Sequence, residues 1–432
     1  MSKFSIWRRY NRRWLTIGMG VKRWLLLLAV GTAVAGIGLV NIFFIADQKG
    51  WLSEMLLHAL TFKFLPPILQ VLVPIIIGGI CVGVAVEKLG RRLLSPFPEP
   101  EDGMAEMLYS YSRRGQGPKI VAIGGGTGMP ALLRGLRQYT DNITAIVTVA
   151  DDGGSSGRLR KELGLLPPGD FRNNIAALSR DEALMTQVLQ YRFGSGAGEN
   201  GRSELQGHAF GNLLLAALTG ITGSFDEALL AAERVLAMRG RVLPSTLANV
   251  DLAADIIRED GSIERVVGES AIPKAYGAIE KLYLQPQFVR AYPPAVKAIL
   301  QADLIVMGPG SLYTSILPNL IVPDITKALQ RTRAKRVYVC NLATQPGETD
   351  NYTVADHVAT ILHHIPADCL DIVLANDNLS IPPDRGGGQT VFVQPVAPQD
   401  VQMKTADLVD TDRPWRHDSA KVAQVVVNLI TK

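Results

Sequence analysis

The chain has 432 residues and a net charge of +4, and 47% of its residues are hydrophobic, as is ordinary for a globular protein. Its length is too great for one average domain, but it fits one large α/β domain with an appendage. Residues 1–118 carry a net charge of +7 and residues 119–432 carry −3, so the larger part is mildly acidic and the charge excludes a typical nucleic-acid-binding protein.

Two long apolar stretches predict a membrane hairpin near the N-terminus. Residues 24–46 and 64–86 contain no Asp, Glu, Lys or Arg. Each is long enough to cross a bilayer core of about 30 Å. The first stretch is too long for a signal peptide, and no cleavage site stands out after it. The second contains three prolines and Gln70, which weaken it as a span and leave a buried core helix as the alternative.

Lys and Arg are concentrated on both outer flanks of these stretches, at 3–23 and at 88–114. The positive-inside rule therefore places the large C-terminal part in the cytoplasm. We expect residues 1–94 to form a multi-pass anchor in the inner (plasma) membrane, with the lipid bilayer as a partner. Residues 95–118, rich in Pro, Gly and charge, are the predicted linker.

The remaining chain, 119–432, predicts a Rossmann-like, doubly wound parallel α/β sheet, because short buried strands alternate with helices. The predicted strands are 119–123, 143–149, 303–307, 336–340 and 371–375. The predicted helices are 128–138, 172–191, 208–220, 224–238, 293–301, 323–333 and 350–363. A small β-rich stretch, 240–290, predicts an insertion or an antiparallel edge, with a hairpin over Leu252–Val267. Residues 382–420 give no interpretable pattern.

Glycine-rich or polar turns follow most of these strands. The first, Gly124–Gly128, contains Gly126-x-Gly128-x-x-Ala131, a variant of the dinucleotide fingerprint without the P-loop lysine. Since the carboxyl ends of parallel strands meet at one sheet edge, we expect the turns to form one pocket for an anionic, nucleotide-like ligand. The alternatives are glycines that only allow helix packing, and helix caps at Asp152, Ser155 or Asp170.

The candidate ligand-binding residues all belong to these turns. They are Gly124, Gly125, Gly126, Thr127, Gly128, Asp151, Asp152, Gly153, Ser155, Ser156, Asp170, Arg172, Asn173, Asn174, His208, Asn212, Gly308, Pro309, Gly310, Ser311, Asn341, Thr344 and Gln345. Asp151 and Asp152 are candidates for hydroxyl recognition, for Mg²⁺ coordination or for acid–base chemistry. A lone histidine such as His208 is more often structural than catalytic.

The ordered motifs between about 119 and 380 resemble the gluconeogenesis factor (YvcK-like) family, which is homologous to 2-phospho-L-lactate transferase. They are Gly124–Gly128, Asp151–Gly157, Pro168–Asp170 with Asn173-Asn174, Gly207-His208 with Gly211-Asn212, Gly308–Ser311 and Thr344–Thr349. The N-terminal hairpin lies outside this resemblance and indicates a membrane-anchored member.

The resemblance implies a Rossmann-like core that binds a UDP-sugar such as UDP-N-acetylglucosamine. It also implies a role in cell shape, cell-wall precursor supply and growth on gluconeogenic carbon. The related transferases move a phospholactyl group from a guanosine-diphospho donor to a deazaflavin with magnesium, and Asp151 matches their acceptor-side carboxylate. Gln345–Glu348 is more similar to the regulatory branch.

Three functions therefore compete. The first is a nucleotide-sugar-binding regulator, and the second is a Mg²⁺-dependent transferase with the metal at Asp151 and Asp152. The third, an NAD-linked oxidoreductase using Asp151 for the ribose, lacks an obvious hydride-site acid. Whether the protein is an enzyme stays open, as does its assembly into a homo-oligomer, and no cofactor is required by the first function.

Overall fold

The computed structural model describes residues 65–94, 117–194, 205–380 and 391–430, and single positions between 30 and 49. The chain divides into two compact units, Met1–Arg113 and Arg114–Lys432. Most of the first predicted span, 24–46, and the predicted linker up to residue 116 lie outside the described residues.

In the first unit, the second predicted span, 64–86, overlaps the 28-residue helix α4 (Pro67–Leu94). Large apolar side chains along α4 are exposed, including Ile68 at 73% and Ile75 at 64%. Within the described part of the chain, no single helix has the length and hydropathy of a membrane span. One bent pair, α10 (Phe210–Thr222) and α11 (Phe225–Val235), meets that test together, with an angle of 115° between its halves.

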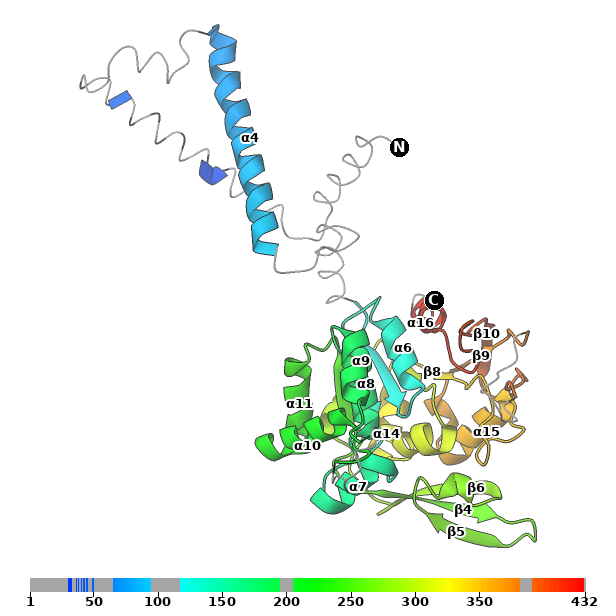
Figure 1. The fold of residues 1–432 in the computed structure, drawn as a ribbon. Helices are drawn as coiled ribbons and strands as arrows, with labels where there is room; N and C mark the ends of the chain where they lie inside the picture. Colours follow the sequence, from blue (N-terminus) through cyan, green and yellow to red (C-terminus); the bar gives the residue numbers. More distant parts are fainter. Residues whose placement is uncertain are drawn as a thin grey trace. The chain divides into compact units, whose positions relative to one another are not determined.

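The second unit is built on a seven-stranded sheet whose neighbouring strands are all parallel, in the order β10-β9-β8-β7-β1-β2-β3 (Figure 1). The strands are β1 (Ile120–Gly124), β2 (Ile143–Val147), β3 (Arg241–Pro244), β7 (Leu304–Met307), β8 (Lys335–Val339), β9 (Ile372–Asn376) and β10 (Gln402–Ala406). The central strands β1 and β7 are buried along their full length, as a parallel sheet covered on both faces requires. The predicted parallel α/β fold is confirmed.

The helices of this unit fall into two groups of packed neighbours. One group comprises α6 (Met129–Leu136), α8 (Gly169–Leu178), α9 (Glu182–Gln190), α10, α11 and α16 (Ser419–Asn428). The other comprises α12 (Pro293–Leu300), α13 (Leu317–Leu320) and α14 (Pro323–Arg331). The remaining helical segments are α7 (Gly154–Leu163), η1 (Ile272–Lys274), η2 (Leu312–Ile316), α15 (Val354–His364) and η3 (Ala367–Cys369).

A second, antiparallel sheet has the order β5-β4-β6 and lies at one end of the unit (Figure 1). Its strands are β4 (Asp251–Ile257), β5 (Ile263–Val267) and β6 (Ala278–Gln285). The predicted hairpin is therefore correct. The run around 240–243 differs from the expectation of an insertion, because it forms β3 and pairs in parallel with β2.

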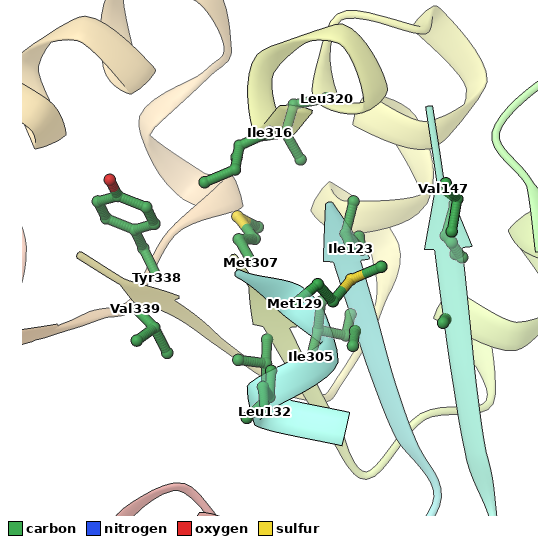
Figure 2. Packing of buried hydrophobic residues seen from close by; sticks show 14 of the residues in the cluster. Ile123, Met129, Leu132, Val147, Ile305, Met307, Ile316, Leu320, Tyr338 and Val339 are labelled. Carbon is green, nitrogen blue, oxygen red and sulfur yellow. The ribbon is translucent and has the colours of Figure 1, made fainter. Parts of the chain in front are cut away.

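The core lies where β1 and β7 pack against the helices that cover the sheet. Figure 2 shows Ile123 of β1 and Met307 of β7 beside Met129, Leu132 and Ile316, and all five side chains are fully buried. Burying one such side chain contributes about 1.5–3 kcal/mol. The site-bearing turns therefore leave a rigid part of the sheet.

Three helical expectations need correction. The predicted helix 172–191 is two helices, because Ser179 adopts an extended conformation and the Asp181 carboxylate caps α9 by accepting from the Leu184 N–H. Asp170 is in the first turn of α8 and is not its N-cap. Helices α7 and α16 are not among the predicted helices. Helix α7 begins in the glycine- and serine-rich turn after β2, and α16 begins at the end of the 382–420 stretch and continues beyond it.

Candidate functional site

The site is at the topological switch point of the sheet. The strand order runs outward in both directions from the neighbours β1 and β7, and open α/β sheets bind ligands at such points. The turns after these two strands are in close contact. A Cβ atom added to Gly128 would lie only 2.7 Å from the Pro309 carbonyl oxygen, so no side chain fits there. The backbone at position 126 has a φ of +63°, in the left-handed region, and this conformation also favours glycine.

A cleft of about 590 Å³, called the main cleft, opens over these turns. Its floor consists of Gly126–Gly128 and Pro309–Ser311, followed by Thr314 and Ser315 of η2. The loop after β8 contributes Asn341, Gln345 and Glu348 to one wall. A volume of this size is typical of small-molecule sites.

Hydrogen bonds fix the polar groups of the cleft floor. Ser311 Oγ donates to Glu348 Oε2, and it accepts from the N–H of Thr314 at 3.1 Å and from Thr314 Oγ1 at 2.8 Å. Asn341 Oδ1 accepts from the Gly310 N–H at 3.2 Å, and its amide group donates to Gln345 at 3.1 Å. Burial raises the pKa of Glu348, while the bond from Ser311 opposes that rise. The floor is thus a preorganised set of hydroxyl, amide and backbone groups.

Glu269 enters the cleft from the segment that follows β5, far from the predicted turns in sequence. Burial and the nearby carboxylates of Asp151, Asp170 and Asp152 together raise its pKa to about 8, against a bond from Thr314. The side chain therefore holds a proton at neutral pH. The sequence offers little local signal for this residue, because the strand that precedes it, β5, belongs to the small antiparallel sheet and not to the parallel one.

A second pocket, of about 240 Å³, is formed by the two turns that follow β2 and by the start of α8. It is lined by Asp151, Gly153, Gly154, Ser155, Ser156, Gly169, Asp170, Arg172, Asn173, Arg192 and Asn212. The two cavities adjoin, since Gly126 lines the main cleft and its N–H donates to Asp170, which lines the second pocket.

Buried polar side chains support the second pocket from behind. Ser155 Oγ is 3.0 Å from His208 Nδ1 and accepts from the Asn212 amide at 3.0 Å. Asn212 Oδ1 in turn accepts from Arg172 at 3.1 Å. His208 therefore orients Ser155 and does not itself line either cavity, which agrees with a structural role for this histidine.

The carboxylates of Asp151 and Asp170 converge, whereas Asp152 points elsewhere. Burial and the charge of Asp151 raise the pKa of Asp170 to about 6, and burial raises the pKa of Asp151. Asp152 Oδ1 accepts from the Ser270 N–H at 2.9 Å, so it fixes the segment that carries Glu269.

This arrangement does not fit the predicted Mg²⁺ pair. Asp151 lines the second pocket, whereas Asp152 lines neither cavity and accepts from the Ser270 N–H, and Asp151 Oδ1 already accepts from the Gly153 N–H at 2.9 Å. Among the residues with described positions, no group of three His, Cys, Asp or Glu side chains is arranged to hold a metal ion.

The predicted site residues divide into three sets. The main cleft is lined by Gly126, Thr127, Gly128, Pro309, Gly310, Ser311, Asn341 and Gln345. The second pocket is lined by Asp151, Gly153, Ser155, Ser156, Asp170, Arg172, Asn173 and Asn212. Those that line neither are Gly124, Gly125, Asp152, Asn174, His208, Gly308 and Thr344.

The residues in this last set support their neighbours. A side chain on Gly125 would collide with the Asp170 carboxylate, and the Asn174 amide donates to the Asp170 carbonyl oxygen at 2.8 Å. Thr344 donates its N–H to the Val391 carbonyl oxygen at 2.9 Å. Asn376, at the end of β9, also lines neither cavity, and its Oδ1 accepts from the Leu408 N–H at 3.1 Å.

The C-terminal region contributes a wall of the main cleft that the sequence did not predict. Asp410, Arg413, Trp415, Arg416, His417 and Ser419 all line it. His417 is buried, its Nε2 lies 3.2 Å from the Cys340 carbonyl oxygen, and burial lowers its pKa to about 4. The neutral ring thus donates to the end of β8 and fixes this wall at the carboxyl edge of the sheet.

Comparison with known proteins places this chain among relatives of one family. A family model described as 2-phospho-L-lactate transferase CofD matches residues 120–431. The gluconeogenesis factor of Bacillus subtilis is 46% identical over 73% of this chain and 99% of its own length. A relative from Deinococcus radiodurans is 36% identical over 98% of this chain and 90% of its own length.

A solved structure has the same fold. The crystal structure of a protein from Bacillus halodurans, a member of the UPF0052 family, is 42% identical to this chain and superposes with a TM-score of 0.61. The match covers 71% of this chain and 98% of the other.

Proposed function

The chain belongs to the 2-phospho-L-lactate transferase (CofD) family and is similar to its members named gluconeogenesis factor, and we propose that its main cleft binds a nucleoside-diphosphate sugar of the UDP-N-acetylglucosamine type. The observation that carries this proposal is the cleft of about 590 Å³ at the β1–β7 switch point. Its bare turns and fixed hydroxyl and amide groups suit a polyhydroxylated, doubly phosphorylated ligand.

The diphosphate is assigned to the turn after β1, where Thr127 and Gly128 offer accessible backbone, because the Gly310 N–H in the turn after β7 already donates to Asn341. The Gly126 N–H is unavailable for this role, because it donates to Asp170. The sugar hydroxyls are assigned to the side of Glu269 and Glu348, which can donate when protonated and accept when ionised.

At the level of the cell, we propose that the bound nucleotide-sugar couples cell-wall precursor supply to cell shape and to growth on gluconeogenic carbon. We further propose that residues 1–94 anchor the chain in the inner membrane with residues 119–432 in the cytoplasm. The exposed apolar side chains of α4 support the membrane anchor. The basic flanks support the cytoplasmic position of the C-terminal part. Digestion of the C-terminal part by protease added outside intact spheroplasts would refute it.

Calorimetric titration of the purified full-length chain with UDP-N-acetylglucosamine, GDP and NAD tests the ligand. We expect the UDP-sugar to bind without added metal. Asp151→Asn tests the adjoining pocket and should weaken binding roughly 10- to 150-fold if the sugar reaches that carboxylate, because a hydrogen bond to a charged group contributes about 1.5–3 kcal/mol. Asp400→Asn, at an exposed position outside both cavities, is the matched control. Binding of NAD alone, or of no nucleotide, would refute the proposal.

One observation favours a transferase as the second candidate. The second pocket adjoins the main cleft through the Gly126–Asp170 contact, and it holds a carboxyl group with a pKa of about 6. A group with that pKa can accept the proton of an acceptor hydroxyl near neutral pH. Turnover of a GDP-linked donor that is lost in Asp170→Asn would favour this candidate over a regulator.

A further inference from the structure

A loop close to the C-terminus forms one wall of the main cleft, and no predicted site residue belongs to it. This C-terminal loop runs from Val409 to His417, which pair in an antiparallel bridge at its base. It presents the half-buried Trp415 and the exposed Arg413 to the cleft.

The conformation of the C-terminal loop is fixed by its own hydrogen bonds. Asp410 Oδ1 accepts from the N–H groups of Asp412 at 2.9 Å and Arg413 at 3.2 Å. The Arg416 N–H donates to the Arg413 carbonyl oxygen at 2.8 Å, and the Asp410 N–H donates to the Arg416 carbonyl oxygen at 3.1 Å. The buried His417 fixes the loop to the end of β8. These bonds order the backbone on both sides of Trp415.

Charge is distributed unequally between the walls of the cleft. The C-terminal loop contributes Arg413 and Arg416 together with one carboxylate, Asp410. The nearby Arg134 of α6 pairs with Glu182 at 2.8 Å. The carboxyl groups of Glu269 and Glu348 lie with the turn after β7. A nucleotide-sugar has the complementary asymmetry, since its phosphates are anionic and its sugar is neutral and rich in hydroxyl groups. The base, which is attached on the phosphate side, then falls next to Trp415.

We propose that the C-terminal loop is the nucleotide-recognition element of the main cleft, in which Trp415 stacks on the base and Arg413 pairs with phosphate. This inference rests on the proposed function and assigns the direction in which the ligand lies. An indole face is a good stacking platform for any nucleobase, and an arginine can pair with phosphate through two parallel hydrogen bonds.

The test uses the full-length chain and three probes: UDP-N-acetylglucosamine, UDP and inorganic pyrophosphate. Stacking of one base contributes about 1–3 kcal/mol, so Trp415→Ala should weaken both uridine nucleotides roughly 5- to 150-fold and leave pyrophosphate unchanged. Arg413→Ala should weaken all three. Phe288→Ala, which removes an aromatic side chain that is 90% exposed outside the cleft, should change none of them.

Tryptophan fluorescence gives a readout that a folding defect cannot imitate. The other four tryptophans are at positions 7, 14, 24 and 51, so Trp415 is the one tryptophan of the sequence beyond residue 51. UDP should quench the parent chain, and Trp415→Phe should bind UDP within a few-fold of the parent without that quenching. Unchanged affinity of Trp415→Ala for UDP overturns the inference alone. A parent chain that binds no nucleotide overturns both the inference and the proposed function.

Discussion

Replacement of Glu269 by Gln tests the electrostatic account of the main cleft. Burial and three neighbouring carboxylates raise the pKa of Glu269 from its ordinary value of 4.5 to about 8. In the unfolded chain the side chain loses its proton near pH 4.5, so the folded chain binds one extra proton between pH 4.5 and 8. The contribution of Glu269 to stability is therefore lost as the pH rises through this window.

The size of the effect follows from the difference between the two pKa values. That difference corresponds to at most about 5 kcal/mol. The side chain is partly exposed, so solvent screening lowers the expected value to about 2 kcal/mol. Gln has the same shape and carries no charge at any pH, so Glu269→Gln should match the parent near pH 4.5 and exceed its stability by about 2 kcal/mol at pH 8.5.

Urea unfolding of the full-length chain at a series of pH values measures this difference. Glu259→Gln, at an exposed carboxylate in the turn between β4 and β5, is the control for the loss of one negative charge. If the stability of Glu269→Gln stays parallel to that of the parent from pH 4.5 to 8.5, then Glu269 ionises normally and the account of its surroundings is wrong.

Two further substitutions test the turns and the C-terminal loop. Gly128→Ala should destabilise the chain by about 1–3 kcal/mol in urea unfolding, because the new methyl group meets the backbone of Pro309, whereas Gly220→Ala, with open space around it in α10, should be neutral or slightly stabilising. His417→Gln should reduce the loss of stability on acidification between pH 6.5 and 4, since a histidine with a lowered pKa contributes stability that disappears as the unfolded chain takes up its proton; a pH series that leaves the parent and the variant parallel would contradict this.

The sequence predicts the sheet and about half of the residues that line the two cavities, because both depend on local patterns. Short apolar runs such as Ile120–Gly124 are typical of buried strands when they are brief and end in glycines, and the turns after them mark the edge of the sheet. The turns after β1 and β7 meet as expected, since adjacent parallel strands end at the same edge.

The remaining residues of the site come from long-range packing, which no local pattern reports. Glu269 reaches the cleft because Asp152 accepts from the Ser270 N–H, a contact across 118 residues. The one pocket that the sequence predicts is in fact two adjoining cavities. The boundary between the two cavities is at the Asp170 carboxylate, which accepts from the Gly126 N–H. Neither arrangement could be read from the spacing of residues along the chain.

The C-terminal loop reaches the cleft because the chain returns from the sheet edge to its centre. Strand β10 is at the edge of the sheet, far from β1 in the strand order, yet α16 packs on α6, the helix that directly follows β1. The two helices are so close that any side chain on Gly135 would overlap the Ser419 carbonyl oxygen. The segment that joins β10 to α16 must therefore pass over the ends of β8 and β7, where His417 binds the Cys340 carbonyl oxygen. The close helix contact at Gly135 and the bond from His417 thus bring Trp415 to the main cleft, although nothing near Trp415 in sequence indicates it.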